Sequence, residues 1–357
     1  MPQLLGKEIG PIGYGLMGFC WPYAPTPQEQ AFEAMREALT NGLNFWNAAD
    51  FYGTPEYNSR LWFLVSAGYE KQEEYPFGHV AKEELTCCVC RQLHLLEAYF
   101  AKYPEDADKV VLSVKSAYSS SGIDASPEGI RRFLDNCINL LKGRKKIDIF
   151  ECARRDPNTP LDVTFGVLEK EYVQTGKIGG IGLSEVRAST IHEAAKITTI
   201  AAVEIELSLF ATDVLDNGVV AAAKEHDIPV IAYSPLGRGI LTGQIKSVDD
   251  LPQHLRAYPR FQKDVFPLNL ELVKHIELIA AKKGIKPAQL AINWVRAVAK
   301  KTGASIIPIP GATTVARVDE NSKVIDLTDE EVAELDSILK KIEVVGARYP
   351  PYIPIEG

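Results

Sequence analysis

Asp50, Tyr52 and Lys115 are residue types that could together carry out acid catalysis. A lysine ammonium beside a phenol favours the phenolate, which lowers the pKa of a tyrosine from about 10 towards a value suited to general acid work. In such an arrangement Asp50 would hold the lysine charged and oriented. Taken alone, the three residues are more simply explained as an ion pair beside a core tyrosine. Their positions in the fold must therefore decide between this explanation and a catalytic site.

All three residues follow or end predicted strands in a chain where strands and helices alternate. One predicted strand begins at Pro11. The other seven cover 44–48, 110–114, 147–151, 178–183, 202–206, 229–233 and 305–309. The helical patterns cover 27–40, 128–141, 161–174, 189–196, 214–226, 270–283 and 287–298. Continuous apolar strands are typical of a parallel sheet buried on both faces. Eight such units predict a (β/α)8 TIM barrel as the single domain of residues 1–357, with its core at about 9–340, and polar residues at strand C-termini then face the active site.

Residues 61–92 interrupt this alternation after the second strand. They contain aromatic residues and the cluster Cys87, Cys88 and Cys90 without clear periodicity. Removing them joins Arg60 to the helical pattern 93–100, which places its apolar residues on one stripe. We interpret 61–92 as an insertion, and two origins stay open: a lid that belongs to the protein, or non-native sequence such as a retained intron.

Composition excludes several classes of protein. The 39 Lys and Arg against 47 Asp and Glu give a net charge of −8, without the basic surface that nucleic-acid binding needs. No run approaches the ~20 apolar residues of a membrane span, and residues 1–10 lack the pattern of a signal peptide. Six cysteines are too few for a disulfide scaffold. We expect a soluble cytoplasmic protein, with access to the nucleus left open.

Two motifs resemble binding sites without their physical context. The glycines of 13–18 match the dinucleotide pattern G-x-G-x-x-G, but Pro22, Pro25 and Pro27 forbid the helix that must follow. Cys87 and Cys90 have a spacing suited to zinc but lack a second well-spaced pair. We therefore predict neither a Rossmann fold nor a metal.

Four segments carry a resemblance to a known family. They are 47–53, 176–184, 233–243 and 309–314, the last followed by Arg317, Glu320 and Asn321. In this order and on these strands, they resemble the aldo-keto reductase superfamily, and the likeness runs from about residue 9 to 336 apart from 61–92. The segment 149–160 is more closely similar to the fungal pyridoxal reductases within it.

The resemblance implies NADPH-dependent reduction of a small-molecule aldehyde, with pyridoxal to pyridoxine, a reaction of vitamin B6 metabolism, as the leading candidate. Nicotinamide would deliver hydride to the carbonyl carbon while Tyr52 protonates the oxygen, with Asp50 and Lys115 tuning Tyr52. The alternative is a non-catalytic NADPH-binding redox sensor or accessory subunit. The oligomeric state stays undetermined.

The same resemblance assigns a cofactor site. Tyr233 would stack on nicotinamide and Arg317 would hold the adenosine ribose phosphate, because a guanidinium matches a phosphate bidentately; this favours NADP over NAD. The cofactor positions are Ser184, Glu204, Tyr233, Ser234, Leu236, Arg238, Gly239, Thr313, Thr314, Arg317, Glu320 and Asn321.

The chain also departs from the family pattern. Ala153 stands where most members have a histidine after the fourth strand, so Arg154, a water or the substrate's own ortho hydroxyl must assist the carbonyl. Glu185 replaces an asparagine, and Glu204 replaces a glutamine. Trp21, Phe51 and Arg154 are the predicted substrate residues, and 342–357 is predicted to be an extended tail that closes over the site.

Overall fold

The computed structural model describes residues 2–20, 25–53, 92–119, 121–351, 353 and 355–356. Its main sheet has eight parallel strands in the order β12-β11-β10-β9-β8-β5-β4-β3. The strands are β3 (Tyr14–Gly15), β4 (Phe45–Ala49), β5 (Val111–Ser116), β8 (Ile147–Cys152), β9 (Ile178–Ser184), β10 (Ile200–Glu206), β11 (Val230–Tyr233) and β12 (Ile306–Pro308). A bridge between Gly15 and Gly311, and a hydrogen bond from Gly13 N to the Pro308 carbonyl at 2.9 Å, join the two edges. The predicted (β/α)8 barrel is confirmed.

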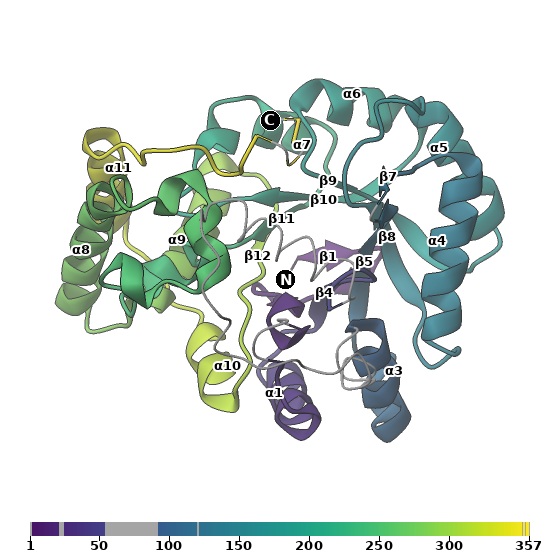
Figure 1. The fold of residues 1–357 in the computed structure, drawn as a ribbon, viewed down its shortest axis with the longest axis horizontal. Coiled ribbons are helices and arrows are strands. Elements are labelled where there is room, and N and C mark those ends of the chain that lie inside the picture. The colour runs from purple at the N-terminus through teal and green to yellow at the C-terminus, as the bar shows by residue number, and fades with distance from the viewer. Residues whose placement is uncertain are drawn as a thin grey trace, which may run out of the picture.

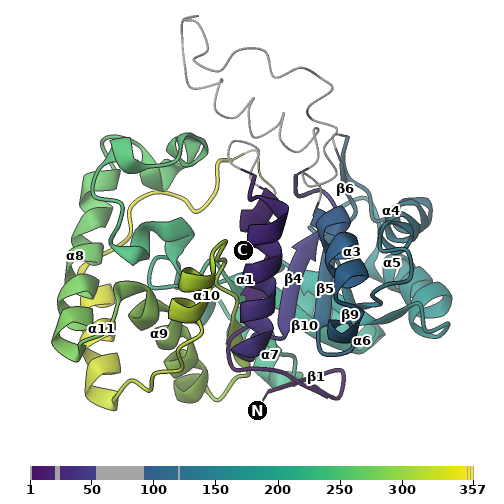
Figure 2. The same cartoon turned by 90° about the horizontal axis from the view of Figure 1, so that it is seen from below.

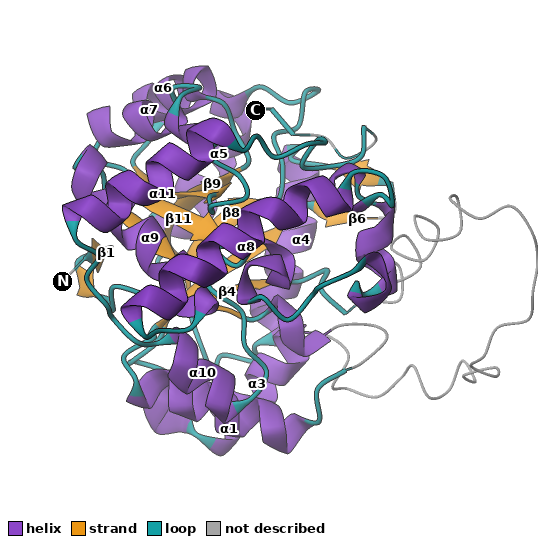
Figure 3. Ribbon diagram, turned by 90° about the vertical axis from the view of Figure 1, so that its left-hand side faces the viewer, coloured by secondary structure: helices purple, strands orange, loops and turns teal. Residues whose placement is uncertain are grey.

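Helices surround the strands in a ring (Figure 1), so the strands lie inside a helical layer (Figure 3). The helices are α1 (Gln28–Thr40), α3 (Gln92–Lys102), α4 (Pro127–Leu140), α5 (Leu161–Leu168), α6 (Ala188–Ile197), α7 (Val219–Glu225), α8 (Phe266–Lys283), α9 (Pro287–Thr302), α10 (Val315–Asn321) and α11 (Asp329–Lys341). Local signals set several boundaries: Ser126 caps α4 by accepting from Gly129 N, and Thr328 and Glu331 form a capping box at α11. Within the described residues, no helix is long and apolar enough to cross a membrane.

Side-chain alternation along the strands builds the barrel interior. Phe45, Val111, Ile149, Ala202 and Ile231 point inward and form one apolar cluster with Leu4, Ile9, Ile307 and Ile309. The hairpin of β1 (Gln3–Leu4) and β2 (Lys7–Glu8) covers this cluster at the amino-terminal end, and the C-terminal tail crosses the opposite end (Figure 2). Two or four residues further along the same strands, the inward positions become polar. The polar layer of the barrel therefore lies directly above this apolar cluster, which we call the apolar floor.

The predicted helices differ from the observed ones in a few places. The pattern at 93–100 is confirmed as part of α3, whose Leu93, Leu96 and Phe100 are buried. Gln92, predicted as the last inserted residue, is instead the first residue of α3; its Oε1 accepts from Ala49 N at 2.8 Å. The rest of the predicted insertion, 61–91, lies outside the described residues.

Two other predicted helices differ from the observed ones, and two observed helices were not predicted. The helix predicted at 214–226 begins only at Val219, because Gly218 adopts a left-handed φ of +89°. The helix predicted at 161–174 ends as α5 and continues as a π-turn at Glu169–Val173. Helices α10 and α11 were not predicted.

Candidate active site

A buried lysine organises the polar layer of the barrel. Lys115 Nζ lies 2.8 Å from both carboxylate oxygens of Glu204 and 2.7 Å from Asn47 Oδ1. A second carboxylate, Glu151, lies 3.9 Å from the same nitrogen. These four residues come from four strands and are all buried. Their positions have the inward parity of the apolar residues below them, which is why the strands bring them together.

The charges in this cluster are unequal, because one ammonium faces two carboxylates. Glu151 also accepts a hydrogen bond from Ser113 Oγ at 3.2 Å. Burial, followed by repulsion from Glu204, raises the pKa of Glu151 well above its ordinary value. Glu204, at 2.8 Å, is therefore the direct ionic partner of Lys115, and Glu151 is the more distant carboxylate, whose charged form burial and Glu204 both disfavour.

Asp50 does not make the predicted ion pair with Lys115. Its Oδ2 accepts from Ser116 Oγ at 2.5 Å and from the Cys137 thiol at 3.7 Å, and its Oδ1 has no hydrogen-bond partner among the described residues. The reason is parity: Asp50 continues the outward-facing series of β4, towards α4 and Cys137, whereas Lys115 faces inward. Burial raises the pKa of Asp50 to about 6. Glu204 thus has the role predicted for Asp50.

Tyr52 lies beside the lysine cluster, with Lys115 Nζ 5.7 Å from its ring centroid. Burial, and then the negative charge of Glu204, raise the pKa of Tyr52 well above its ordinary value. The predicted lowering of this pKa is therefore wrong for the structure described, because burial of the phenol dominates and the nearby Glu204 carboxylate acts in the same direction. Phe51 packs edge-on against Tyr52 at 4.9 Å and against Tyr118 at 5.5 Å between ring centroids.

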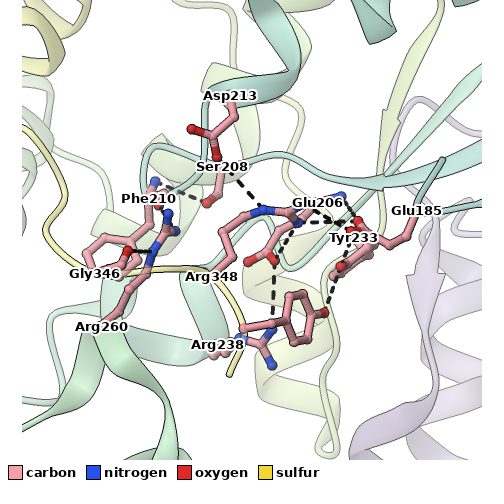
Figure 4. Close-up of polar contacts among 11 residues, drawn as sticks. Glu185, Glu206, Ser208, Phe210, Asp213, Tyr233, Arg238, Arg260, Gly346 and Arg348 are labelled. Atoms are coloured by element: carbon pink, nitrogen blue, oxygen red, sulfur yellow. Dashed lines mark hydrogen bonds and ion pairs between the residues drawn. The ribbon is translucent and has the colours of Figure 1, made fainter. Parts of the chain in front are cut away.

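A second polar cluster joins the C-terminal tail to the barrel (Figure 4). Arg348 donates to Glu185 Oε2 at 3.0 Å and to Glu206 Oε2 at 3.1 Å, and its side chain is 8% exposed. Tyr233 donates to Glu185 Oε1 at 2.9 Å, and its hydroxyl lies 2.7 Å from that of Tyr349. Burial works to raise the pKa of Glu185, but the charge of Arg348 holds it below its ordinary value. The Arg348 guanidinium thus binds two buried carboxylates, and Arg238, 3.7 Å from Glu206, adds a second positive charge.

The loop after β11 offers a buried guanidinium nitrogen that makes no hydrogen bond within the described residues. The guanidinium carbon of Arg238 lies 4.5 Å from the ring centroid of Tyr258 and 4.9 Å from that of Tyr349. Its buried Nη2 makes no hydrogen bond with a described residue, and the carboxylate of Glu206 is 3.7 Å away. Ser234, Arg238 and Gly239 all have positive φ. A buried guanidinium with an unused N–H fits the phosphate oxygen that the family resemblance implies.

The loop after β12 lies close to the loop after β11. Arg317 Nη2, in exposed α10, donates to Gln244 Oε1 at 3.5 Å, and Thr314 caps α10 by accepting from Arg317 N. Asn321 donates to the Gly311 carbonyl at 3.4 Å. The structure places the remaining predicted cofactor residues on these loops or at the end of β9, namely Ser184, Leu236, Thr313 and Glu320. Glu204 differs, because Lys115 and Asn47 already engage both of its oxygens.

The predicted substrate residues are only partly accounted for. Trp21 lies outside the described residues. Arg154 follows β8; its Nη1 donates to the Ala153 carbonyl at 2.6 Å, and its guanidinium lies 5.9 Å from the Tyr349 ring centroid. Ala153 is buried, and its methyl group offers no hydrogen-bond donor.

Sequence reasoning missed four residues of the two clusters: Asn47, Glu151, Glu206 and Arg348. The first three share one signal, an amide or carboxylate within an otherwise apolar strand, which marks a buried and therefore partnered polar group. Arg348 gives no comparable signal, because its partners are more than 140 positions away in the chain.

Comparisons with known proteins agree with this architecture. The Aldo/keto reductase family model matches residues 11–340. The probable pyridoxal reductase 2 of Schizosaccharomyces pombe is 37% identical and aligns over 98% of this chain and 97% of its own. The putative pyridoxal reductase of Saccharomyces cerevisiae is 33% identical over 94% and 95%. A Schizosaccharomyces pombe protein named as an NADP(+) aldo-keto reductase is 34% identical over 97% and 94%.

A solved structure supports the fold alone. The glycerol dehydrogenase from Gluconobacter oxydans superposes with a TM-score of 0.74 at 21% identity, over 99% of this chain and 98% of that one.

The raised pKa of Asp50 predicts a pH dependence of stability. Because the folded state binds this proton more tightly than the unfolded state does, the stabilisation is complete below about pH 4 and is lost as pH rises through 6. A difference of about two pKa units corresponds to roughly 3 kcal/mol. Urea unfolding between pH 4 and 7 should show this loss in the wild type and not in Asp50→Asn. The exposed-site control Asp264→Asn should keep the wild-type profile; identical profiles for all three proteins would contradict the assignment.

The Arg348 cluster predicts a large coupling energy. Arg348→Met should lower the free energy of unfolding by about 3–5 kcal/mol, because it leaves Glu185 buried without the guanidinium that binds it and leaves Glu206 with only Arg238, 3.7 Å away. The same change should cost less in a Glu185→Gln background. Arg131→Met, which breaks an exposed pair with Glu171, should cost no more than about 1 kcal/mol. Equal losses for the two arginine variants would show that the cluster lacks this role.

Proposed function

Because the chain belongs to the aldo/keto reductase family, we propose that it uses NADPH to reduce an aldehyde to an alcohol, with pyridoxal as the substrate. The observation that carries this proposal is Tyr52 beside Lys115, in the end of the barrel where enzymes of this architecture hold their active sites. The names of two curated relatives favour pyridoxal, and the name of a third favours NADP(H).

The cofactor supplies hydride to the carbonyl carbon when it is bound. Arg238, with its unused buried N–H, would hold a phosphate oxygen, and Arg317 would hold the phosphate that distinguishes NADP from NAD. Tyr233 would lie against the nicotinamide ring at the end of β11. These assignments rest on residues of two neighbouring loops, which supports binding of an extended nucleotide across them.

Tyr52 would give its phenolic proton to the carbonyl oxygen. The raised pKa makes this proton harder to release, so the transfer needs a nearby charge that stabilises the phenolate as it forms. When the proton leaves, a phenolate forms beside the Lys115 ammonium, whose attraction grows at that moment. Glu204 and Asn47 hold that ammonium in place. Asp50 supports the site from outside through Ser116, and it does not contact Lys115.

The missing donor at Ala153 points to substrates that assist themselves. Pyridoxal has a hydroxyl ortho to its aldehyde, which can hydrogen-bond the carbonyl oxygen internally. Arg154, beside the tail residue Tyr349, would accommodate the partial charge of that hydroxyl. Phe51 offers an aromatic face next to Tyr52 for the pyridine ring.

A second function has one observation in its favour. With Ala153 in place of a histidine and Glu185 in place of an asparagine, the chain could bind NADPH without turning over a substrate, as a redox sensor or accessory subunit does. In either case a reducing cytoplasmic location fits the thiols of Cys137 and Cys152, which form no disulfide among the described residues.

NADPH oxidation with pyridoxal tests the reaction. The full chain should be active, and Tyr52→Phe should lower kcat by about 10²–10⁴-fold, because it removes the proton donor and keeps the ring. Tyr118→Phe is the matched control, since Tyr118 lies against the same Phe51 and has no assigned proton transfer. NADPH binding without turnover in every variant would support the sensor instead. Activity that arises only after deletion of 61–91 would identify that segment as foreign to the fold.

The ortho hydroxyl is tested with a matched pair of substrates. Pyridoxal should have a higher kcat/KM than pyridine-4-carboxaldehyde, which lacks the hydroxyl, and the ratio should shrink when a histidine is introduced by Ala153→His. Equal turnover of the two aldehydes by the wild type would contradict this part of the proposal.

A further inference from the structure

Helices α6 and α7 are neighbours in the outer ring of the barrel (Figure 1), and two histidines from these elements face each other. His192 lies in α6, and His226 directly follows α7. The His192 Nδ1 and His226 Nε2 atoms are 2.8 Å apart, and the two rings meet nearly edge-on with centroids 5.0 Å apart. A hydrogen bond between two neutral rings uses one proton at this position.

Glu225 adds a carboxylate to this pair. One ligand atom from each of His192, Glu225 and His226 lies within 4.8 Å of the other two. Both histidines are half-buried, and Glu225 is exposed. The supporting helices are fixed by packing, because Ile191 and Ala194 on α6 are buried, as are the residues of α7 that face the barrel. The three groups are thus presented by two anchored elements.

This donor set matches zinc in type and in geometry. Two imidazole nitrogens with one carboxylate oxygen suit a borderline divalent ion, whereas calcium and magnesium prefer sites made of oxygen alone. Zinc–nitrogen bonds of about 2.0–2.1 Å at a tetrahedral angle place the two nitrogens about 3.3 Å apart. The present separation of 2.8 Å must therefore increase by about 0.5 Å, which side-chain torsions can supply.

We propose that His192, Glu225 and His226 form a zinc(II) site in which water completes the coordination and the ion fastens α6 to α7. When zinc takes the place of the hydrogen between the two rings, the imidazole that carried it stays neutral by holding that hydrogen on its other ring nitrogen. Helix α6 contributes one ligand and the C-terminal end of α7 contributes two, so ion binding and the packing of the two helices stabilise each other.

The site is independent of the proposed reductase reaction. Helix α7 ends at Glu225, shortly before β11 begins at Val230, so the ligands from its end lie towards the amino-terminal ends of the strands. Tyr52 and Lys115 lie at the carboxyl ends. Zinc at this position should therefore change stability and leave NADPH oxidation unchanged.

Calorimetric titration of the EDTA-treated full chain with zinc tests the site. The titration uses a Cys87→Ser, Cys88→Ser, Cys90→Ser background, which removes thiols that compete for zinc. One ion should bind per chain, and His192→Ala or His226→Ala should weaken its affinity at least about tenfold by removing one of three protein ligands. Zinc should raise the unfolding temperature by several degrees only where both histidines are present.

His275→Ala is the matched control, because His275 Nε2 lies 3.8 Å from Glu271 on α8 without a second histidine ligand. It should bind zinc as the wild type does. The readout is the zinc-induced shift in each protein, measured against its own unfolding temperature in EDTA, so a loss of packing in a variant does not imitate a loss of binding. Zinc affinity that is equal in the wild type, His192→Ala and His226→Ala overturns the proposal. Cobalt(II) bound with a thiolate charge-transfer band overturns it too.

Discussion

The alternation of side chains along parallel strands is the constraint on which the rest of this structure depends. Inward positions form an apolar floor that includes Phe45 and Val111, and two to four residues later the same faces present Asn47 and Lys115. A buried ammonium in that layer is tolerable only with a close anion, and Glu204 supplies it from across the barrel. Asp50 lies one residue out of this inward alternation. It therefore faces outward and accepts a hydrogen bond from Ser116, although it is close in sequence to Tyr52.

The order and type of elements could be predicted from the sequence, because continuous apolar strands alternate with amphipathic helices over almost the whole chain. The details that failed have local physical causes. The left-handed conformation of Gly218 moves the start of α7 to Val219. A π-helical turn at Glu169–Val173 ends α5 within a stretch whose sequence pattern is continuously helical. Gln92 looks like the end of a polar insertion, yet its amide side chain is buried against the backbone of β4.

The site was predictable in its residues and not in its pairings. Motifs indicate that Tyr52, Lys115, Tyr233 and Arg238 lie at one end of a barrel, but they contain no information on which carboxylate meets which cation. That choice depends on register between strands and on contacts such as Arg348 with Glu185, which only the folded chain defines. The pKa of Tyr52 shows the consequence, because burial raises it first and the charge of Glu204, from a distant strand, raises it further.

The contact between Arg348 and Glu185 also has a consequence for biosynthesis. The two residues are separated by 163 positions, so a ribosome adds Arg348 long after Glu185. Until Arg348 emerges, Glu185 lacks the guanidinium that binds it and Glu206 has only the more distant Arg238, at 3.7 Å, although all eight strands have already been synthesised. Cotranslational folding can therefore assemble the barrel, while its carboxyl end reaches its final electrostatic balance only after Arg348 has emerged.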